Sequence, residues 1–250
     1  MALDFNQQSF TKTAESVAID EGLRAYMLKV YNYMTTALLI TGFVAYFFGK
    51  ASMITNESGQ VVQYTEIGML LFGSPLAFVI MFAPLIMIFF GFSKISTMSV
   101  SKAQTIFWVF SFLMGLSMAS IFIAYTEASI TRVFFICSGT FAATSLYGYT
   151  TKRDLTALGS FLFMGLIGLI ITSIVNWFLQ SPMLYYLISA AGVLIFVGLT
   201  AYDTQKIKNI YNSSDAESVS SKKAIMGALS LYLDFINLFV MLLRLFGQRR

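Results

Sequence analysis

Long runs of uncharged, apolar residues separated by short polar loops dominate the chain. Residues 30–49 form the first such run, and its twenty uncharged positions are enough to cross about 30 Å of hydrocarbon as a helix. Between Asp154 and Asp203 there are 48 uncharged residues, which is too long for one membrane helix and right for two, with a polar turn at 176–182. The pattern predicts seven membrane spans, at 30–49, 70–92, 103–125, 133–149, 158–178, 184–206 and 224–243.

The second span differs from the others because it contains Pro75 and Pro84. Each proline removes a helix hydrogen bond and is expected to kink the helix. In membranes such breaks are tolerated where neighbouring helices or a cavity satisfy the freed carbonyl groups. A kink that only serves packing is an equally good interpretation.

The composition agrees with an all-α polytopic membrane protein. Hydrophobic residues make up 57% of the chain and charged residues 11%, whereas a soluble domain has about 25% charged residues. We expect a polar, cytoplasmic amino-terminal segment at 1–29 with a short interfacial helix at 16–29, a transmembrane domain at 30–245, and a short basic tail at 246–250. The first 25 residues carry several charges and no apolar core, so no cleavable signal peptide is expected.

The absence of histidine limits the chemistry. Without it, the chain cannot form a zinc site of the usual kind, an HExxH protease or a Ser-His dyad. We therefore expect no enzyme and no cofactor, and any pH response near neutrality must come from carboxyl groups. The single cysteine, Cys137, lies in an apolar run and is interpreted as a packing residue. The net charge of +4 comes from loop residues and indicates topology, not nucleic-acid binding.

The distribution of lysine and arginine predicts the orientation in the membrane. The amino terminus and alternate loops carry eleven of these 16 residues, which leaves five for the other side. This bias places the amino terminus in the cytoplasm, and an odd number of spans then places the carboxyl terminus outside. Arg244, Arg249 and Arg250 near the carboxyl terminus pull against that assignment.

Two aspartates, Asp203 and Asp234, lie within the sixth and seventh spans. An ionisable side chain at membrane depth is costly and is a functional-site hypothesis by default. Both residues lie at a similar distance from the same membrane face, so the two helices can bring the carboxyl groups together. Such a pair shares a proton and can respond to pH, and when ionised it offers oxygen ligands to Ca²⁺. Alternatively, Asp203 is an interfacial residue near Lys206, and Asp234 bonds the backbone of a neighbouring helix.

A second candidate contact lies on the outer side. Glu66 at the start of the second span and Arg244 at the end of the seventh could form an ion pair that closes the outer mouth. The alternative is that Arg244 reaches lipid headgroups and Glu66 is solvated. Glu127, between the third and fourth spans, is most simply a solvated loop residue.

Several motifs in the second half of the chain resemble the signature of the Bax inhibitor-1 family, in its bacterial form. They occur in the family's order and are found at Gly115–Thr126, Gly139–Gly148, Thr151–Leu155, Ala201–Gln205 and Leu231–Phe239. The resemblance covers nearly the whole chain. It implies a seven-helix protein of the bacterial inner membrane with the last helix near the centre of the bundle.

The resemblance also implies a function, a pH-sensitive calcium leak channel gated by two aspartates, which correspond here to Asp203 and Asp234. Ca²⁺ would be the transported or bound ion. A basic partner for the aspartates is expected in the second span, but residues 70–92 contain none. Bacterial relatives are also tied to a membrane-bound AAA-type protease, so the alternative is a membrane-embedded regulator that transports nothing.

A third class, the intramembrane aspartyl protease, also has aspartates on its sixth and seventh helices. That family requires Gly-x-Gly-Asp at the second aspartate, and this chain has Leu231-Tyr-Leu-Asp234. Its Pro-Ala-Leu motif is also missing. The sequence therefore disfavours this class.

Overall fold

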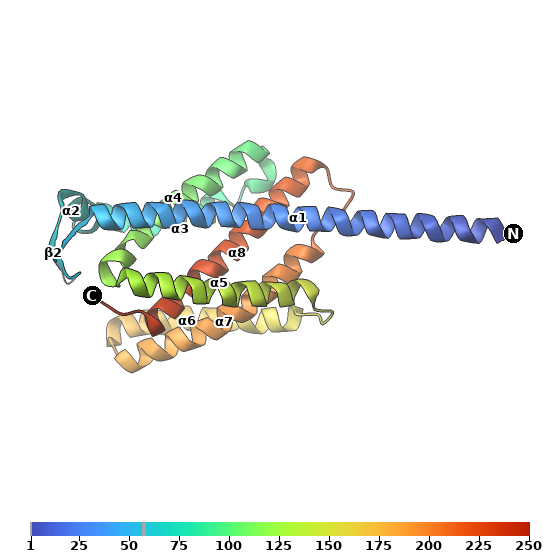
Figure 1. Cartoon of the computed structure of the whole chain (residues 1–250). Coiled ribbons are helices and arrows are strands. Elements are labelled where there is room, and N and C mark those ends of the chain that lie inside the picture. Colours follow the sequence, from blue (N-terminus) through green and yellow to red (C-terminus); the bar gives the residue numbers. More distant parts are fainter. Residues whose placement is uncertain (1, 57–58) are drawn as a thin grey trace.

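The computed structural model describes residues 2–56 and 59–250, and for residues 2–20 it describes the backbone only. The prediction of an all-α membrane protein is confirmed. The helices pack into an elongated bundle (Figure 1). The elements in chain order are α1 (Ala2–Ala51), β1 (Met53–Thr55), β2 (Val61–Tyr64), α2 (Glu66–Phe72), α3 (Leu76–Ile86), a π-helical turn (Met87–Gly91), a 3-10 turn (Ile95–Thr97), α4 (Val100–Ala124), α5 (Glu127–Thr150), α6 (Thr156–Leu179), α7 (Pro182–Asn209) and α8 (Glu217–Phe246).

The predicted polar turn between the fifth and sixth spans is confirmed. α6 ends at Leu179 and α7 begins at Pro182. The Ser181 hydroxyl accepts a hydrogen bond from the Leu184 amide at 3.3 Å, so one of the free amides of the first turn is satisfied. Proline suits the first position because its missing N–H has no partner inside a helix there.

The second span is broken. α2 and α3 meet at an angle of 55°, and the break contains Pro75. Pro84, by contrast, lies inside α3 and does not end it. By length and composition, six of the described helices can cross a membrane, and the number is seven if the bent α2–α3 pair is one span. The predicted number of seven therefore depends on this pair.

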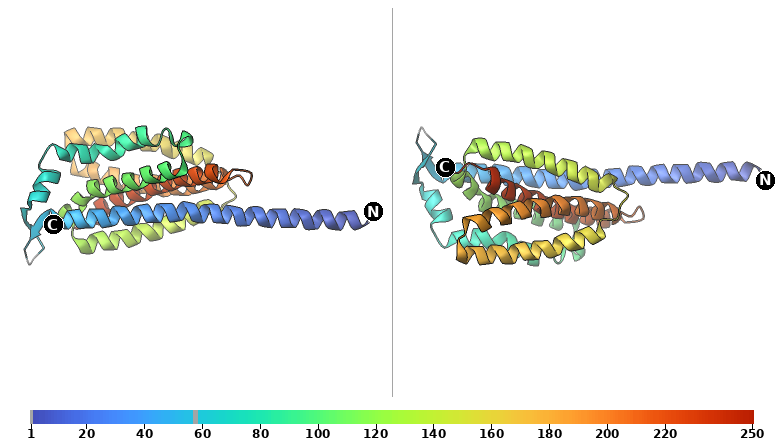
Figure 2. Two further views of the ribbon diagram at one scale, coloured as in Figure 1. Left: turned by 90° about the horizontal axis from the view of Figure 1, so that it is seen from above. Right: turned by 90° about the horizontal axis from the view of Figure 1, so that it is seen from below.

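α1 is longer than the sequence pattern indicated. The interfacial helix predicted at 16–29 and the span predicted at 30–49 form one continuous helix, so the prediction of a separate lead-in element is wrong. Residues 16–41 contain no proline and only one glycine, so nothing in this stretch interrupts the helix. The amino-terminal part of α1 projects well beyond the other helices (Figure 2).

The two ends of the bundle differ. At the hairpin end, β1 and β2 form a short antiparallel hairpin with Met53 opposite Tyr64, close to where the chain ends (Figure 1). The opposite end, called the amino-terminal end, holds the loop between α7 and α8 and the projecting part of α1.

The last helix, α8, is the most enclosed of the candidate spans. In its apolar segment 72% of the residues are buried, against 17–33% in the other described spans. α8 contacts α1, α4, α5 and α7. Its buried positions are therefore shielded from lipid by protein on several sides.

Candidate functional site: two aspartates on adjacent helices

The register between α7 and α8 sets the relative height of the two aspartates. A Cβ atom added to Gly192 would lie 2.8 Å from the Met241 side chain, and one added to Gly227 would lie 3.1 Å from Ile207. The helices therefore run antiparallel with these pairs side by side. In this register Asp203 and Asp234 differ in height by about one helical turn, or about 5 Å.

The two carboxyl groups have different surroundings. Asp234 is 6% exposed, and its Oδ2 atom has no hydrogen-bond donor among the described residues. Asp203 is partly buried, and its carboxyl group interacts electrostatically with Asp234 and with Lys206, which lies one turn further along α7. The structure thus places the two predicted residues within electrostatic range of each other. The alternative, a hydrogen bond between Asp234 and the backbone of a neighbouring helix, is not formed within the described residues.

A hydrogen-bond chain fixes α7 beside these groups. The hydroxyl of Thr204, next to Asp203, is 2.9 Å from the Ser145 hydroxyl of α5. Ser145 in turn is 2.7 Å from the Tyr31 hydroxyl of α1. On the neighbouring turn of α7, Ala201 packs closely on Gly148 of α5. A Cβ atom added to Gly148 would lie 2.2 Å from the Ala201 carbonyl oxygen.

α8 is held by a second set of hydroxyl contacts. The Tyr232 hydroxyl is 2.7 Å from Thr41 Oγ1 of α1, and Thr41 donates to the Ser111 carbonyl of α4 at 2.8 Å. Together, the two sets fix how α7 and α8 are rotated and so how the aspartates face each other. Sequence reasoning missed these residues, although hydroxyl side chains inside otherwise apolar spans were a usable signal.

Two cavities approach the aspartates from the hairpin end. One of about 800 Å³ lies between α2, α3, α4 and α8, and one of about 490 Å³ lies between α6, α7 and α8. Asn237 and Arg244 of α8 line both of them, and Leu233 lines the larger one. Asp234 lines neither, although it is one helical turn from Asn237. Neither of these two cavities reaches the Asp234 side chain.

The predicted outer ion pair between Glu66 and Arg244 is not present among the described residues. Glu66 is exposed in the first turn of α2, where a negative charge interacts favourably with the helix dipole. The Arg244 guanidinium lies 5.4 Å from the centre of the Tyr185 ring. Each residue thus has a local interaction of its own.

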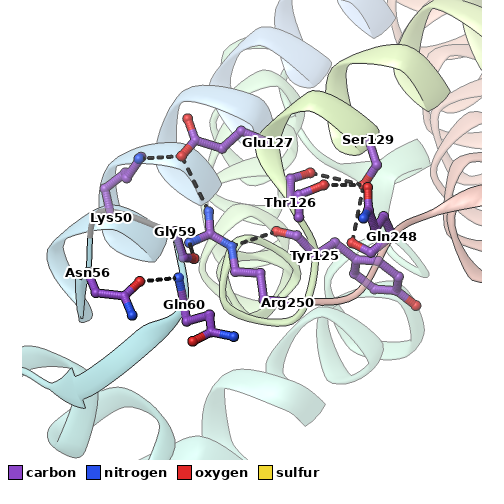
Figure 3. A network of polar contacts seen from close by, with 10 residues as sticks. All are labelled: Lys50, Asn56, Gly59, Gln60, Tyr125, Thr126, Glu127, Ser129, Gln248 and Arg250. Atoms are coloured by element: carbon purple, nitrogen blue, oxygen red, sulfur yellow. Dashed lines mark hydrogen bonds and ion pairs between the residues drawn. The ribbon is translucent and has the colours of Figure 1, made fainter.

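The carboxylate that does form ion pairs at the hairpin end is Glu127 (Figure 3). It begins α5, and the interpretation as a solvated loop residue is wrong because it pairs with Lys50 from the end of α1 and with Arg250 at 3.3 Å. Arg250 also donates to the carbonyl groups of Tyr125 at 3.0 Å and Gly59 at 2.9 Å. This set of five residues, called the Glu127 network, joins α1, the hairpin loop, the α4–α5 linker and the end of the chain.

The capacity of the aspartate pair for a metal ion is limited. Carboxylate oxygens suit Ca²⁺, but that ion takes about six to eight oxygen ligands. Where side chains are described, no group of three His, Cys, Asp or Glu residues gathers. An ion between Asp203 and Asp234 would need water or backbone carbonyls to complete its shell, which suits weak, transient binding.

The fold defines a class of protein: a polytopic α-helical membrane protein, here with one acidic residue in each of its last two helices. Residues 23–250 match the family model described as "Inhibitor of apoptosis-promoting Bax1". The chain belongs to this Bax inhibitor-1 family.

Relatives from several bacteria match over almost their whole length. An uncharacterized protein of Rickettsia prowazekii is 47% identical over 97% of this chain and 98% of its own. The inner membrane protein YbhL of Escherichia coli K12 is 44% identical over 96% of this chain and 99% of its own. An uncharacterized protein of Caulobacter vibrioides is 39% identical over 99% of both chains.

Proposed function

We propose that this protein is a passive, proton-gated cation leak in a bacterial inner membrane, with Ca²⁺ as the ion. One observation carries the proposal: Asp234 is buried in the most enclosed helix, its Oδ2 atom has no hydrogen-bond donor among the described residues, and it interacts electrostatically with a second carboxyl group on α7. The resemblance of the sequence motifs to those of the Bax inhibitor-1 family, which implies a pH-sensitive calcium leak, supports the same activity. The name of the Escherichia coli relative supports the inner membrane as the location.

The gating mechanism follows from electrostatics in a medium of low dielectric constant. A proton held by the pair leaves at most one negative charge, and Asp203 and Asp234 can stay adjacent. Loss of that proton leaves two like charges, which cannot remain close without a counter-ion. α7 and α8 then separate or rotate at this level, and the two cavities lined by Asn237 become continuous with the aspartates. A cation entering from them neutralises the pair.

The direction of the pH effect is fixed by this scheme. Raising the pH removes the proton, so flux rises with pH, and lowering the pH closes the path. The second span supplies no basic partner for the closed state, and we assign that role in part to Lys206, which interacts with Asp203.

The test is Ca²⁺ flux into proteoliposomes between about pH 6 and pH 8. Because gating in this scheme involves the loss of one proton, the flux should change at most about tenfold per pH unit. We expect Asp203→Asn and Asp234→Asn to hold the flux at its low-pH rate. The matched control is Asp154→Asn, since the Asp154 carboxylate is an exposed loop group that accepts a hydrogen bond from the Thr156 amide at 2.9 Å. Asparagine variants that keep both the flux and its pH dependence would disprove the mechanism.

A second candidate function is regulation of a membrane-bound AAA-type protease without transport. The observation that favours it is the projection of α1 beyond the bundle, which offers a partner a helix outside the membrane-spanning part (Figure 2). Deleting residues 2–20 should then remove co-purifying protease and leave Ca²⁺ flux unchanged. Co-purification by the full chain together with no flux at any pH would favour regulation alone.

A further inference from the structure

α1 and α5 are joined at both ends but separate between them. Tyr31 contacts Ser145 towards the amino-terminal end, and Lys50 pairs with Glu127 at the hairpin end. The space between the two helices is an apolar cavity of about 1010 Å³. We call it the α1–α5 groove; its walls include Arg24, Met34, Leu38, Ser138 and Ala142, and Phe235 of α8 lies at its floor.

The groove opens towards the surroundings of the bundle and not towards a neighbouring helix. Leu39 and Phe43 on its α1 wall are 68% and 72% exposed, and Leu146 on its α5 wall is 62% exposed. These residues belong to candidate membrane spans, so the surroundings at this depth are hydrocarbon. An apolar groove without contents would lose dispersion contacts along its whole lining, which favours an apolar chain inside it.

The amino-terminal end of the groove is positively charged. Arg24 lines it, is exposed, and forms no ion pair among the described residues. Opposite, the ring of Tyr149 lines the groove with the Lys208 ammonium 5.1 Å from its centre. Glu21, one turn before Arg24, is not part of the lining. A guanidinium at this position suits a phosphate group, which it binds through paired N–H donors.

The dimensions fit one leaflet. From Arg24 to Leu38, α1 rises about 21 Å. Half of a bilayer of about 40–45 Å, including its headgroups, has the same thickness. We propose that the α1–α5 groove binds a membrane phospholipid, with the phosphate at Arg24 and one acyl chain between Leu38 and Ala142.

This occupant would touch α8 directly, and α7 only indirectly, through α5. Phe235 at the floor follows Asp234 in α8, and Ser145 on the wall contacts Thr204 beside Asp203. Lipid binding itself does not depend on cation transport, so the proposal stands or fails apart from the leak activity.

Two adjacent alanines on α5 provide a matched pair of variants. Both are exposed, but Ala142 lines the groove and Ala143 does not. Ala142→Phe fills the groove, and Ala143→Phe adds the same ring to the outer surface. Should Ala142→Phe fail to fold, Gly42→Phe fills the groove from α1, since no atom lies within 4 Å of a Cβ added at Gly42.

The experiment is native mass spectrometry of the full chain released from bilayers of phosphatidylethanolamine and phosphatidylglycerol, with stepwise removal of lipid. Wild type and Ala143→Phe should keep one phospholipid, and Ala142→Phe should lose it. Arg24→Ala should weaken retention about tenfold, the equivalent of one charge-assisted hydrogen bond. Arg153→Ala, which removes an exposed loop arginine, should have no effect.

Three results would overturn the proposal. Equal lipid retention by Ala142→Phe and Ala143→Phe would show that the groove is not the binding site. Unchanged retention by Arg24→Ala would remove the phosphate contact. A dimer that Ala142→Phe dissociates, with no bound lipid, would show that a second copy of the chain fills the groove.

Discussion

Glu127 and Asp234 are two carboxyl groups in opposite situations. Glu127 lies at the hairpin end, is 44% exposed, and is paired with two cations brought from distant parts of the chain. Asp234 lies inside the bundle, is 6% exposed, and has another carboxyl group beside it instead of a cation. Water could solvate the Glu127 carboxylate, and it is nevertheless paired. Asp234 would benefit far more from a basic partner, and none of the described residues supplies one.

The contrast indicates what each group is for. Pairing at Glu127 holds together segments that are far apart in sequence, which is a structural role. An acidic group that stays buried without a cation reduces stability, because a polar group removed from water loses its hydrogen bonds. Such a cost is tolerated at functional sites. The comparison therefore indicates a scaffold role for Glu127 and supports the gating role proposed for Asp234.

The largest effect on stability is expected at the contact between α5 and α7. This contact holds α7, and with it Asp203, in place relative to α8. Gly148→Ala would place a Cβ 2.2 Å from the Ala201 carbonyl oxygen and push α7 away from α5. We expect it to destabilise the protein by about 1–3 kcal/mol, the usual cost of overpacking. The measurement is the midpoint of thermal unfolding in detergent.

Gly139→Ala on the same helix is the control for this variant, because no atom lies within 4 Å of its added Cβ. Its midpoint should equal that of the wild type or exceed it slightly, given the higher helix propensity of alanine. Equal midpoints for the two variants would show that the close contact between α5 and α7 is not needed.

A somewhat smaller effect of opposite sign is expected at Asp234, the carboxyl group proposed to gate the leak. Asp234→Leu replaces an unpartnered buried carboxyl group by an apolar side chain of similar size. It should stabilise the protein by about 1–2 kcal/mol, as replacements of buried charged groups often do, and should abolish Ca²⁺ flux. Thermal unfolding and flux are measured on the same preparation. A clear loss of stability would mean that Asp234 belongs to the scaffold after all.

The smallest effect is expected at Glu127. Because the carboxylate is partly exposed, Glu127→Gln should cost only about 0.5–1 kcal/mol, as is usual for surface ion pairs. High salt should lower the unfolding midpoint of the wild type towards that of the variant, since screening weakens exposed pairs. The flux and its pH dependence should not change. Glu66→Gln, which removes an exposed carboxylate without an ion pair, is the control.

The sequence predicted most of the helices because the length of an uncharged run corresponds directly to a membrane crossing. It did not predict where helices begin. Hydropathy changes near residue 30, but the helix that crosses there starts at Ala2, because leaving the membrane does not by itself end a helix. α8 likewise begins at Glu217 and not at Ala224.

The aspartate pair and the Glu127 network show what kind of contact a single sequence reveals. Asp203 and Asp234 lie on consecutive antiparallel helices, so an approach between them could be expected from the order of the helices in the sequence. Lys50 and Arg250 are 77 and 123 positions from Glu127, and each looks like an ordinary loop charge. Only the folded chain brings them together, because the end of α1, the start of α5 and the carboxyl-terminal residues meet at the hairpin end. The prolines of the second span show the same limit, since the sequence marked both as kinks and only Pro75 lies in the break.

The way the last residue of the chain is held has a practical consequence for anyone who adds a tag or reporter. The Arg250 amide donates to the Ala124 carbonyl at 3.1 Å, and its side chain reaches Glu127, Tyr125 and Gly59. A fusion partner attached there would start inside this contact set and pull on the hairpin end. A fusion at the projecting start of α1 would avoid it, so orientation assays are better built on that end.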